Sequence, residues 1–151
     1  MKPLLRYGHL FYVMVMLVGL AGCSSVRLIA EYDELIDQQV TEIYRQMESQ
    51  LVFLERYANA EEAKYEQNTD FYDGVKIDLR SLKVRAAAHP KNDITLQQID
   101  LLVQNVELMQ QMHQAGISQN DIPPLRKAFE VSTTAIIKLE LAKRRGEKME
   151  Q

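Results

Sequence analysis

The sequence predicts an all-α protein, an antiparallel up-down-up-down four-helix bundle, and three observations support this prediction. Apolar residues recur every three or four positions along four segments, which is the period of an amphipathic α-helix. The segments are separated by short breaks that contain helix-ending residues, such as Pro90 and Gly116. No segment alternates apolar and polar residues as a half-buried strand does. Short connections between amphipathic helices favour antiparallel neighbours.

The longest helical pattern runs from Arg27 to Ala58 and contains neither Gly nor Pro. Its spacing is close to 3.67 residues per turn, which matches a nearly straight α-helix. Acidic residues gather near its beginning, where the helix dipole favours negative charge. We therefore expect this segment to form the first helix. Its predicted core positions are Ile29, Tyr32, Ile36, Val40, Ile43, Met47, Leu51, Leu54 and Ala58.

The pattern is weaker over residues 59–69. The segment from Asn59 to Glu62 is similar to the start of a new helix, with Glu62 placed to complete a capping box. The following residues to Asn68 are polar and weakly periodic, so helix and loop both stay open for this stretch. A three-helix arrangement with an irregular segment near 59–69 is the alternative to the four-helix bundle.

The same spacing predicts two further helices before Gly116. The second ends at His89, because the residue before a proline avoids the helical region. The third begins at Asp93 or at Thr95, where Thr95 and Gln98 match a capping box, and Gly116 ends it. Core positions in the second helix are Phe71, Val75, Leu79, Leu82 and Ala86. Core positions in the third are Leu96, Ile99, Val103, Val106 and Met109.

The fourth predicted helix follows Asp121 as its cap. Pro123 and Pro124 fall in its first turn, where the missing backbone N–H of proline does no harm. A basic run leads to Gly146, which is typical of a helix end. Core positions are Leu125, Phe129, Ile136 and Leu139. We expect the bundle to span residues 27–146 and a polar tail to span residues 147–151.

The N-terminal segment has the parts of a secretory signal. Lys2 and Arg6 form a basic start, and Leu10–Leu20 is an almost unbroken apolar run. That run has the length of a signal-peptide core and falls short of the roughly 20 residues that a bilayer-spanning helix needs. The segment closes with the four residues Leu20-Ala21-Gly22-Cys23.

This ending resembles the lipobox of bacterial lipoproteins. The resemblance implies that residues 1–22 are a lipoprotein signal peptide, that cleavage falls before Cys23, and that acyl chains such as palmitate attach to Cys23. Residues 23–26 would then be a lipid-modified tether. An uncleaved membrane anchor with an incidental cysteine is the alternative. Ser24 follows the cysteine, which by analogy with Gram-negative lipoproteins favours the periplasmic face of the outer membrane. The alternative location is the outer face of the cytoplasmic membrane.

Composition narrows the function classes. The chain carries 18 Lys and Arg against 21 Asp and Glu, and removal of the signal peptide takes away two cations and no acid. A mildly acidic chain argues against nucleic acid as a partner. Cys23 is the only cysteine, so no internal disulfide or thiolate metal cluster forms. The chain lacks a phosphate-binding glycine loop, a zinc-protease motif and a serine elbow, so we expect no catalytic residues and no cofactor.

One possible metal site needs separate weighing. Met109, Met112 and His113 lie on about one helix turn, and thioether and imidazole ligands suit Cu(I). The alternative is that the methionines fill gaps in the core and that His113 favours a helix C-terminus. The second interpretation is preferred, and no metal site is expected.

Three surface features remain as candidate sites. Lys143, Arg144, Arg145 and Lys148 should return to the end of the bundle near Cys23, where they either contact anionic lipid or pair with Glu31, Glu34 and Asp37. Val52, Phe53 and Tyr57 lie off the core row and are either wrapped by neighbouring helices or exposed as a partner patch. Lys76, Arg80 and Lys83 form a stripe that either pairs with acids of the first helix or binds an anionic ligand.

The sequence therefore favours a membrane-anchored envelope lipoprotein that is not an enzyme. Its helical bundle would bind another envelope protein as a scaffold or accessory subunit. The alternative is a binder of a small ligand or ion that uses a gap between helices.

Overall fold

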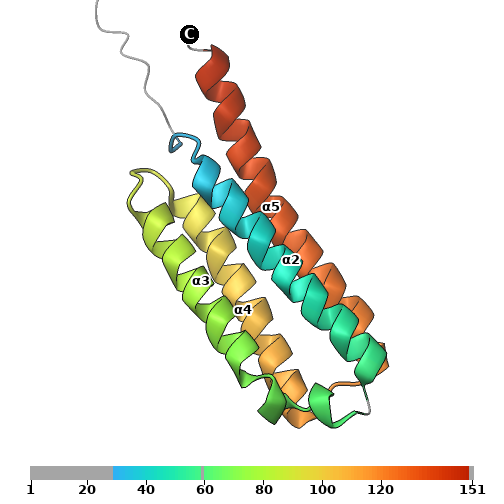
Figure 1. Cartoon of the computed structure of the whole chain (residues 1–151). Helices are drawn as coiled ribbons and strands as arrows, with labels where there is room; N and C mark the ends of the chain where they lie inside the picture. The colour runs from blue at the N-terminus through green and yellow to red at the C-terminus, as the bar shows by residue number, and fades with distance from the viewer. Residues whose placement is uncertain (1–28, 59, 150–151) are drawn as a thin grey trace, which may run out of the picture.

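The computed structural model describes residues 29–58 and 60–149. Within these ranges four helices lie side by side, α2 (Glu34–Tyr57), α3 (Thr69–Ala87), α4 (Asp93–Ala115) and α5 (Ile122–Met149) (Figure 1). Each helix packs against the next along the chain, and α5 returns to pack against α2. The predicted all-α, up-down-up-down four-helix bundle is confirmed, and the described residues contain no strand. The predicted signal peptide (residues 1–22) and the predicted tether (residues 23–26), with Cys23, lie outside the described residues.

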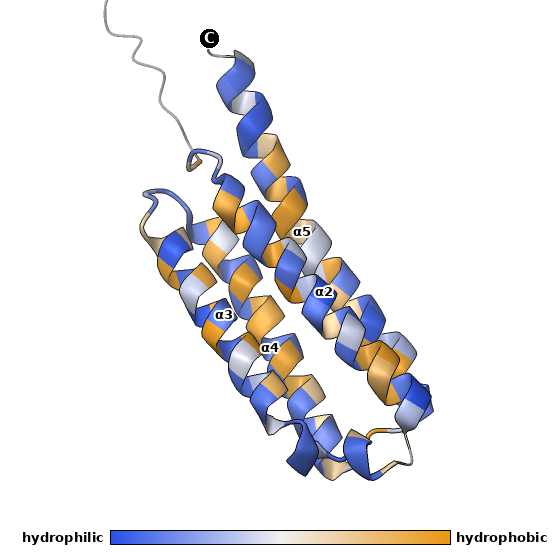
Figure 2. Ribbon diagram, viewed as in Figure 1, coloured by the Kyte–Doolittle hydropathy of each residue, from blue (hydrophilic) through white to orange (hydrophobic). Residues whose placement is uncertain are grey.

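The core is a continuous column of aliphatic side chains from all four helices, with hydrophobic residues in bands along each helix (Figure 2). Its largest fully buried side chains include Tyr72, Phe129, Met47 and Met109. Among the described residues, no helix is long and apolar enough to cross a lipid bilayer.

The first helix begins later than predicted. Asp33 is its N-cap, with an extended backbone at φ −123°, and its Oδ1 accepts a hydrogen bond from the Leu35 N–H at 2.9 Å. Satisfying a free N–H in this way starts the helix at Glu34. Ile29 is therefore exposed and Tyr32 half-buried, and the buried row begins at Ile36.

Residues 60–68 form neither a regular helix nor an open loop. Two 3₁₀ turns follow each other, η1 (Glu61–Ala63) and η2 (Tyr65–Gln67), and no side chain caps the first. Buried Asn68 closes the segment, because its Nδ2 donates to the carbonyls of Glu62 and Lys64 while its Oδ1 accepts from Gln50. The regular helix resumes only at Thr69.

Several predicted core and cap positions need correction. Tyr72 is in the core, whereas the predicted Phe71 is only half-buried. On α4 the core residue is Leu102, and the predicted Leu96 and Val103 are half-buried. Asn92 is the N-cap of α4, so the capping box predicted at Thr95 is wrong. The two core errors share one cause: two adjacent residues fit the helical period almost equally well, and packing decides between them.

The two ends of α5 also differ from the prediction. Ser118 is the N-cap of a 3₁₀ turn that precedes α5, η3 (Gln119–Asp121), and the predicted cap Asp121 instead completes a capping box by accepting from the Ser118 N–H and hydroxyl. Pro123 lies in the first turn of α5, as predicted. The helix then continues through Gly146 to Met149, so the predicted end at Gly146 is wrong.

Gly116 ends α4 with a φ of +100°, a backbone conformation that L side chains rarely adopt, whereas Gly74 lies inside α3. A Cβ at either position would meet nothing within 4 Å, so a substitution tests the backbone alone. We expect Gly116→Ala to lower the free energy of unfolding by about 1 kcal/mol and Gly74→Ala to raise it by a similar amount. Urea unfolding of the protein that begins at Ser24 measures the free energy of unfolding of both variants. If both substitutions raised it, or both lowered it, the expectation would be contradicted.

Candidate functional site

A network of polar side chains, buried except for the half-buried Arg85 and His89, joins the four helices at the end that holds Ile29 and Met149. We call this group the terminal network. It combines residues from the start of the described chain, the α3–α4 connection and the last third of α5. Its members are Asp33, Arg85, His89, Asn92, Thr95, Glu140 and Lys143.

Lys143 and Glu140 form the centre of the terminal network. The Lys143 ammonium donates to Asn92 Oδ1 at 2.7 Å, to Thr95 Oγ1 at 2.8 Å and to Glu140 Oε1 at 2.5 Å. These three bonds use every proton of the ammonium group. Both side chains are almost completely buried, with 2% and 0% of their surface exposed. The charges are therefore paired and hydrogen-bonded, as burial requires.

Asp33 forms the other half of the terminal network. Its carboxylate accepts from Arg85 Nη2 at 2.9 Å, and its second oxygen lies 2.8 Å from His89 Nε2. Burial alone would raise the pKa of Asp33, but the hydrogen bonds from Arg85, Leu35 N–H and His89 outweigh it and hold the pKa below its ordinary value. The Asp33 N–H donates to Glu140 Oε2 at 3.3 Å, which links the two halves.

The residues just before α2 are bound into the same end of the bundle. The Ala30 N–H donates to the Lys91 carbonyl, and the Tyr32 N–H donates to Glu147 Oε1 at 2.6 Å. The Arg144 guanidinium lies over the Tyr32 ring, 5.4 Å from its centroid. The last turns of α5 therefore hold the beginning of the described chain.

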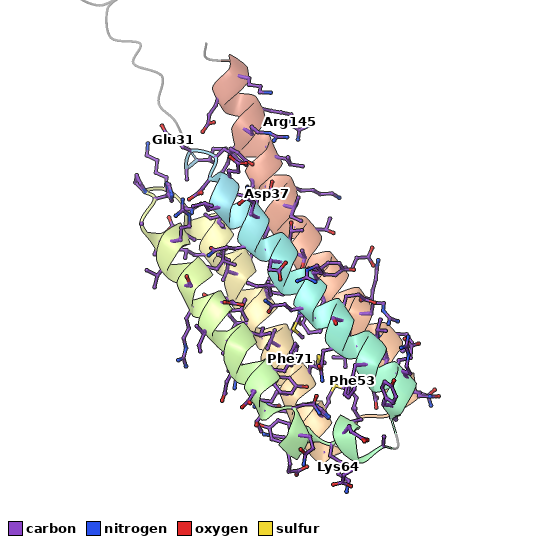
Figure 3. The ribbon with its side chains drawn as sticks, viewed as in Figure 1. Glu31, Asp37, Phe53, Lys64, Phe71 and Arg145 are labelled. Carbon is purple, nitrogen blue, oxygen red and sulfur yellow. The ribbon has the colours of Figure 1, made fainter. Side chains whose placement is uncertain are left out.

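This arrangement corrects the predicted basic cluster. Lys143 is buried inside the terminal network and does not reach the surface, because α5 turns it toward Asn92 and Thr95. The other three cations of the cluster, Arg144, Arg145 and Lys148, are exposed at the same end of the molecule. Figure 3 shows Arg145 at the end of the bundle that also holds Glu31.

Sequence reasoning missed the terminal network, although a signal for it exists. Ile136, Glu140 and Lys143 are spaced by four and three, so the two charged residues continue the core row of α5. Thr95 likewise precedes Ile99 by four on α4. Charged residues on a core row indicate buried pairs.

The predicted partner patch is half covered. Phe53 packs against the core, whereas Val52 and Tyr57 are 40% and 45% exposed. The rings of Phe53 and Tyr57 are in contact, with centroids 5.2 Å apart. Figure 3 places Phe53 toward the end of the bundle opposite Glu31 and Arg145. Phe53 is therefore covered, whereas Val52 and Tyr57 are exposed.

The basic stripe faces α4 and not the first helix. Lys83 pairs with Asp100 of α4 at 2.5 Å, which corrects the predicted pairing with acids of the first helix. A groove of about 280 Å³ lies between α3 and α4. Its lining residues are Lys76, Leu79, Arg80, Lys83, Asp100, Val103, Val106 and Glu107.

His113 takes part in packing at the far end. Its Nε2 lies 2.6 Å from the Ala63 carbonyl, so this nitrogen carries the proton, and its Nδ1 accepts from the Tyr72 hydroxyl at 2.9 Å. Burial raises the pKa of the Tyr72 phenol, which keeps it as a donor. Both ring nitrogens are engaged, so the arrangement gives no support to Cu(I) binding by Met109, Met112 and His113. No group of three or more His, Cys, Asp or Glu side chains is placed to hold a metal within the described ranges.

A cavity of about 230 Å³ lies beside His113 and is lined in part by Leu54, Tyr65 and Ile117. Ordinary ligand pockets measure roughly 300–1,000 Å³. The cavity therefore gives only weak support to the alternative of a small-ligand binder.

Comparisons with protein-family models, with curated protein sequences and with solved structures found no match.

Removing one member of the buried ion pair should cost much more than removing an exposed charge. We expect Lys143→Met to lower the free energy of unfolding by about 3–5 kcal/mol, because Glu140 is left buried without its partner. The double variant Glu140→Leu with Lys143→Met should recover most of that loss. The matched control Lys148→Met should stay within about 0.5 kcal/mol of the wild type. A single variant as stable as this control would contradict the assignment.

Asp33 should make stability depend on acid pH. Its folded-state pKa is lowered, so the ionised carboxylate stabilises the fold above pH ~4, and this contribution disappears as pH falls through the lowered pKa. Asp33→Asn should therefore be less stable at pH 7 and lose stability less steeply on acidification. Urea unfolding between pH 7 and pH 3 measures the slope. The exposed control Asp73→Asn should keep the wild-type slope, and an unchanged slope in Asp33→Asn would refute the role of Asp33.

Proposed function

We propose that this protein is a lipid-anchored envelope lipoprotein whose helical bundle binds another protein as a scaffold or accessory subunit. The lipobox-like ending at Cys23 supports the anchor. Only five residues separate Cys23 from Ile29, so the chain between these two residues spans at most about 20 Å. The observation that carries the proposal is the binding of residues 30–33 to the other helices, which joins this short tether to the bundle as a whole.

The membrane in this proposal is the outer membrane, with the bundle on its periplasmic side. Ser24 after the acylated cysteine favours this location. Arg144, Arg145 and Lys148 are the cations available to anionic headgroups at the tethered end. Each would contribute about 1 kcal/mol where it reaches the lipid surface. Arg144 also stacks on Tyr32, which leaves Arg145 and Lys148 as the less engaged pair.

The partner in this proposal reaches the far end of the bundle. Val52 and Tyr57 expose apolar surface there, and Phe53 supports them from the core side. Aromatic side chains anchored on a rigid element are typical of protein-binding hot spots. The patch lies on α2, whose other face is fully packed, so it is held in a fixed position.

Two variants of the full-length protein test the proposal in cells. Cys23→Ser should abolish incorporation of labelled palmitate and release the protein from the membrane fraction. A photoreactive residue replacing Val52 should form an adduct with one envelope protein, identified by mass spectrometry. The same residue replacing Val131, an exposed aliphatic residue of α5, is the matched control. Palmitate uptake by Cys23→Ser would refute the anchor, and equal adducts at Val52 and Val131 would refute the patch.

A further inference from the structure

The groove between α3 and α4 lies apart from the patch on α2. Its floor is apolar, formed by Leu79, Val103 and Val106. One wall carries the basic stripe of α3, and the other carries Asp100 and Glu107 of α4. The groove therefore combines a hydrophobic floor with walls of opposite charge.

The charges within the groove are unequally paired. Lys83 and Asp100 neutralise each other at 2.5 Å. Lys76 and Arg80 have no carboxylate within 4 Å in the part of the chain that the structure describes. They lie four residues apart on α3, so they present two cations on one side of the helix.

Exposed aliphatic side chains flank the central cation. Ile77 and Val84 are 64% and 73% exposed, and they lie three residues before and four residues after Arg80. These spacings place all three on neighbouring parts of the α3 surface. The outer face of α3 thus carries one cation, Arg80, between two exposed aliphatic residues, Ile77 and Val84, beside the groove.

We propose that this groove binds an amphipathic helix of the partner protein, with two acidic residues four positions apart on one flank of the partner helix. The acids would pair with Lys76 and Arg80 at the rim of the groove, and its apolar face would lie on Val103, with Ile77 and Val84 just beyond the two cations on the outer face of α3. The inference rests on the proposed function, since it names a surface and the chemistry of the partner.

Charge and shape favour this occupant. Glu107 and Asp100 on the opposite wall disfavour a polyanion such as nucleic acid, because like charges in one groove repel. A helix laid against two packed helices meets ridges and grooves of its own period. The walls are helices without free backbone hydrogen-bonding edges, so an extended strand gains no sheet pairing there. A guanidinium such as Arg80 binds a carboxylate with two parallel hydrogen bonds.

The full-length protein in cells provides the test, with a photoreactive residue replacing Ile77. We expect an adduct whose crosslinked peptide lies in an amphipathic helix with acids on one flank. Arg80→Glu should reduce the adduct at least about tenfold, the loss expected for one strong charged contact. Arg145→Glu, an exposed cation outside the groove, should leave the adduct unchanged. Lysine in place of the one partner acid that faces Arg80 should restore the adduct with Arg80→Glu, because the acid opposite Lys76 keeps its partner.

Other outcomes overturn the inference. An adduct insensitive to Arg80→Glu, an adduct with lipid or with a second copy of this chain, or no adduct at Ile77 would each exclude the acidic helix. Arg80 is exposed and holds no ion pair, so Arg80→Glu should retain the wild-type melting temperature, which separates loss of binding from loss of fold. An adduct at Val52 without one at Ile77 would reject the groove and keep the proposed function. The absence of an adduct at both Val52 and Ile77 would reject the groove and the proposed function together.

Discussion

The buried pair of Glu140 and Lys143 determines how the four helices meet at one end. Two charges inside a protein are tolerated only when their remaining bonding positions are filled, and here those positions are filled by α4 and by the Asp33 backbone. Asn92 has two roles, since it accepts from Lys143 and caps the last turn of α3 through the Ala86 carbonyl. The α3–α4 turn and the beginning of α2 therefore take up one arrangement. A purely aliphatic end would pack equally well in several registers, whereas this set of bonds is satisfied in one.

The opposite end uses the same strategy with neutral groups. His113 joins the Ala63 carbonyl to the Tyr72 hydroxyl, and Asn68 joins Gln50 to the two 3₁₀ turns. The core between the two ends is mainly hydrophobic, with the hydrogen bond from Asn105 to Ser132 as a polar contact within it, and the buried networks lie where the chain changes direction. Apart from these two networks, the patch lies on the exposed side of α2, and the groove lies between α3 and α4 beside the Lys83–Asp100 ion pair.

The fold was predictable from spacing because four rows of apolar residues separated by helix-ending residues have few other solutions. The start of the first helix at Glu34 could not be predicted in this way, because Ile29 and Tyr32 continue the apolar row beyond the helix. Only the cap by Asp33 shows where the helix begins. The 3₁₀ turns near Asn68 depend on side-chain contacts with Gln50, eighteen residues away, which periodicity does not report. Of the predicted sites, the exposure of Lys143 failed because charge was taken as a sign of surface, although its spacing from Ile136 is that of a core residue.

The binding of residues 30–33 to the bundle has a consequence for distance. With the anchor proposed at Cys23, the short tether allows a gap of at most about 20 Å between membrane and fold. The 24 residues of α2 add about 36 Å of height. Residues 29–33 add at most about 17 Å, so the far end of α2 would stand within roughly 75 Å of the lipid headgroups. A partner would have to present its binding segment within that height, so the geometry favours proteins of the same membrane or its immediate neighbourhood over those further across the envelope.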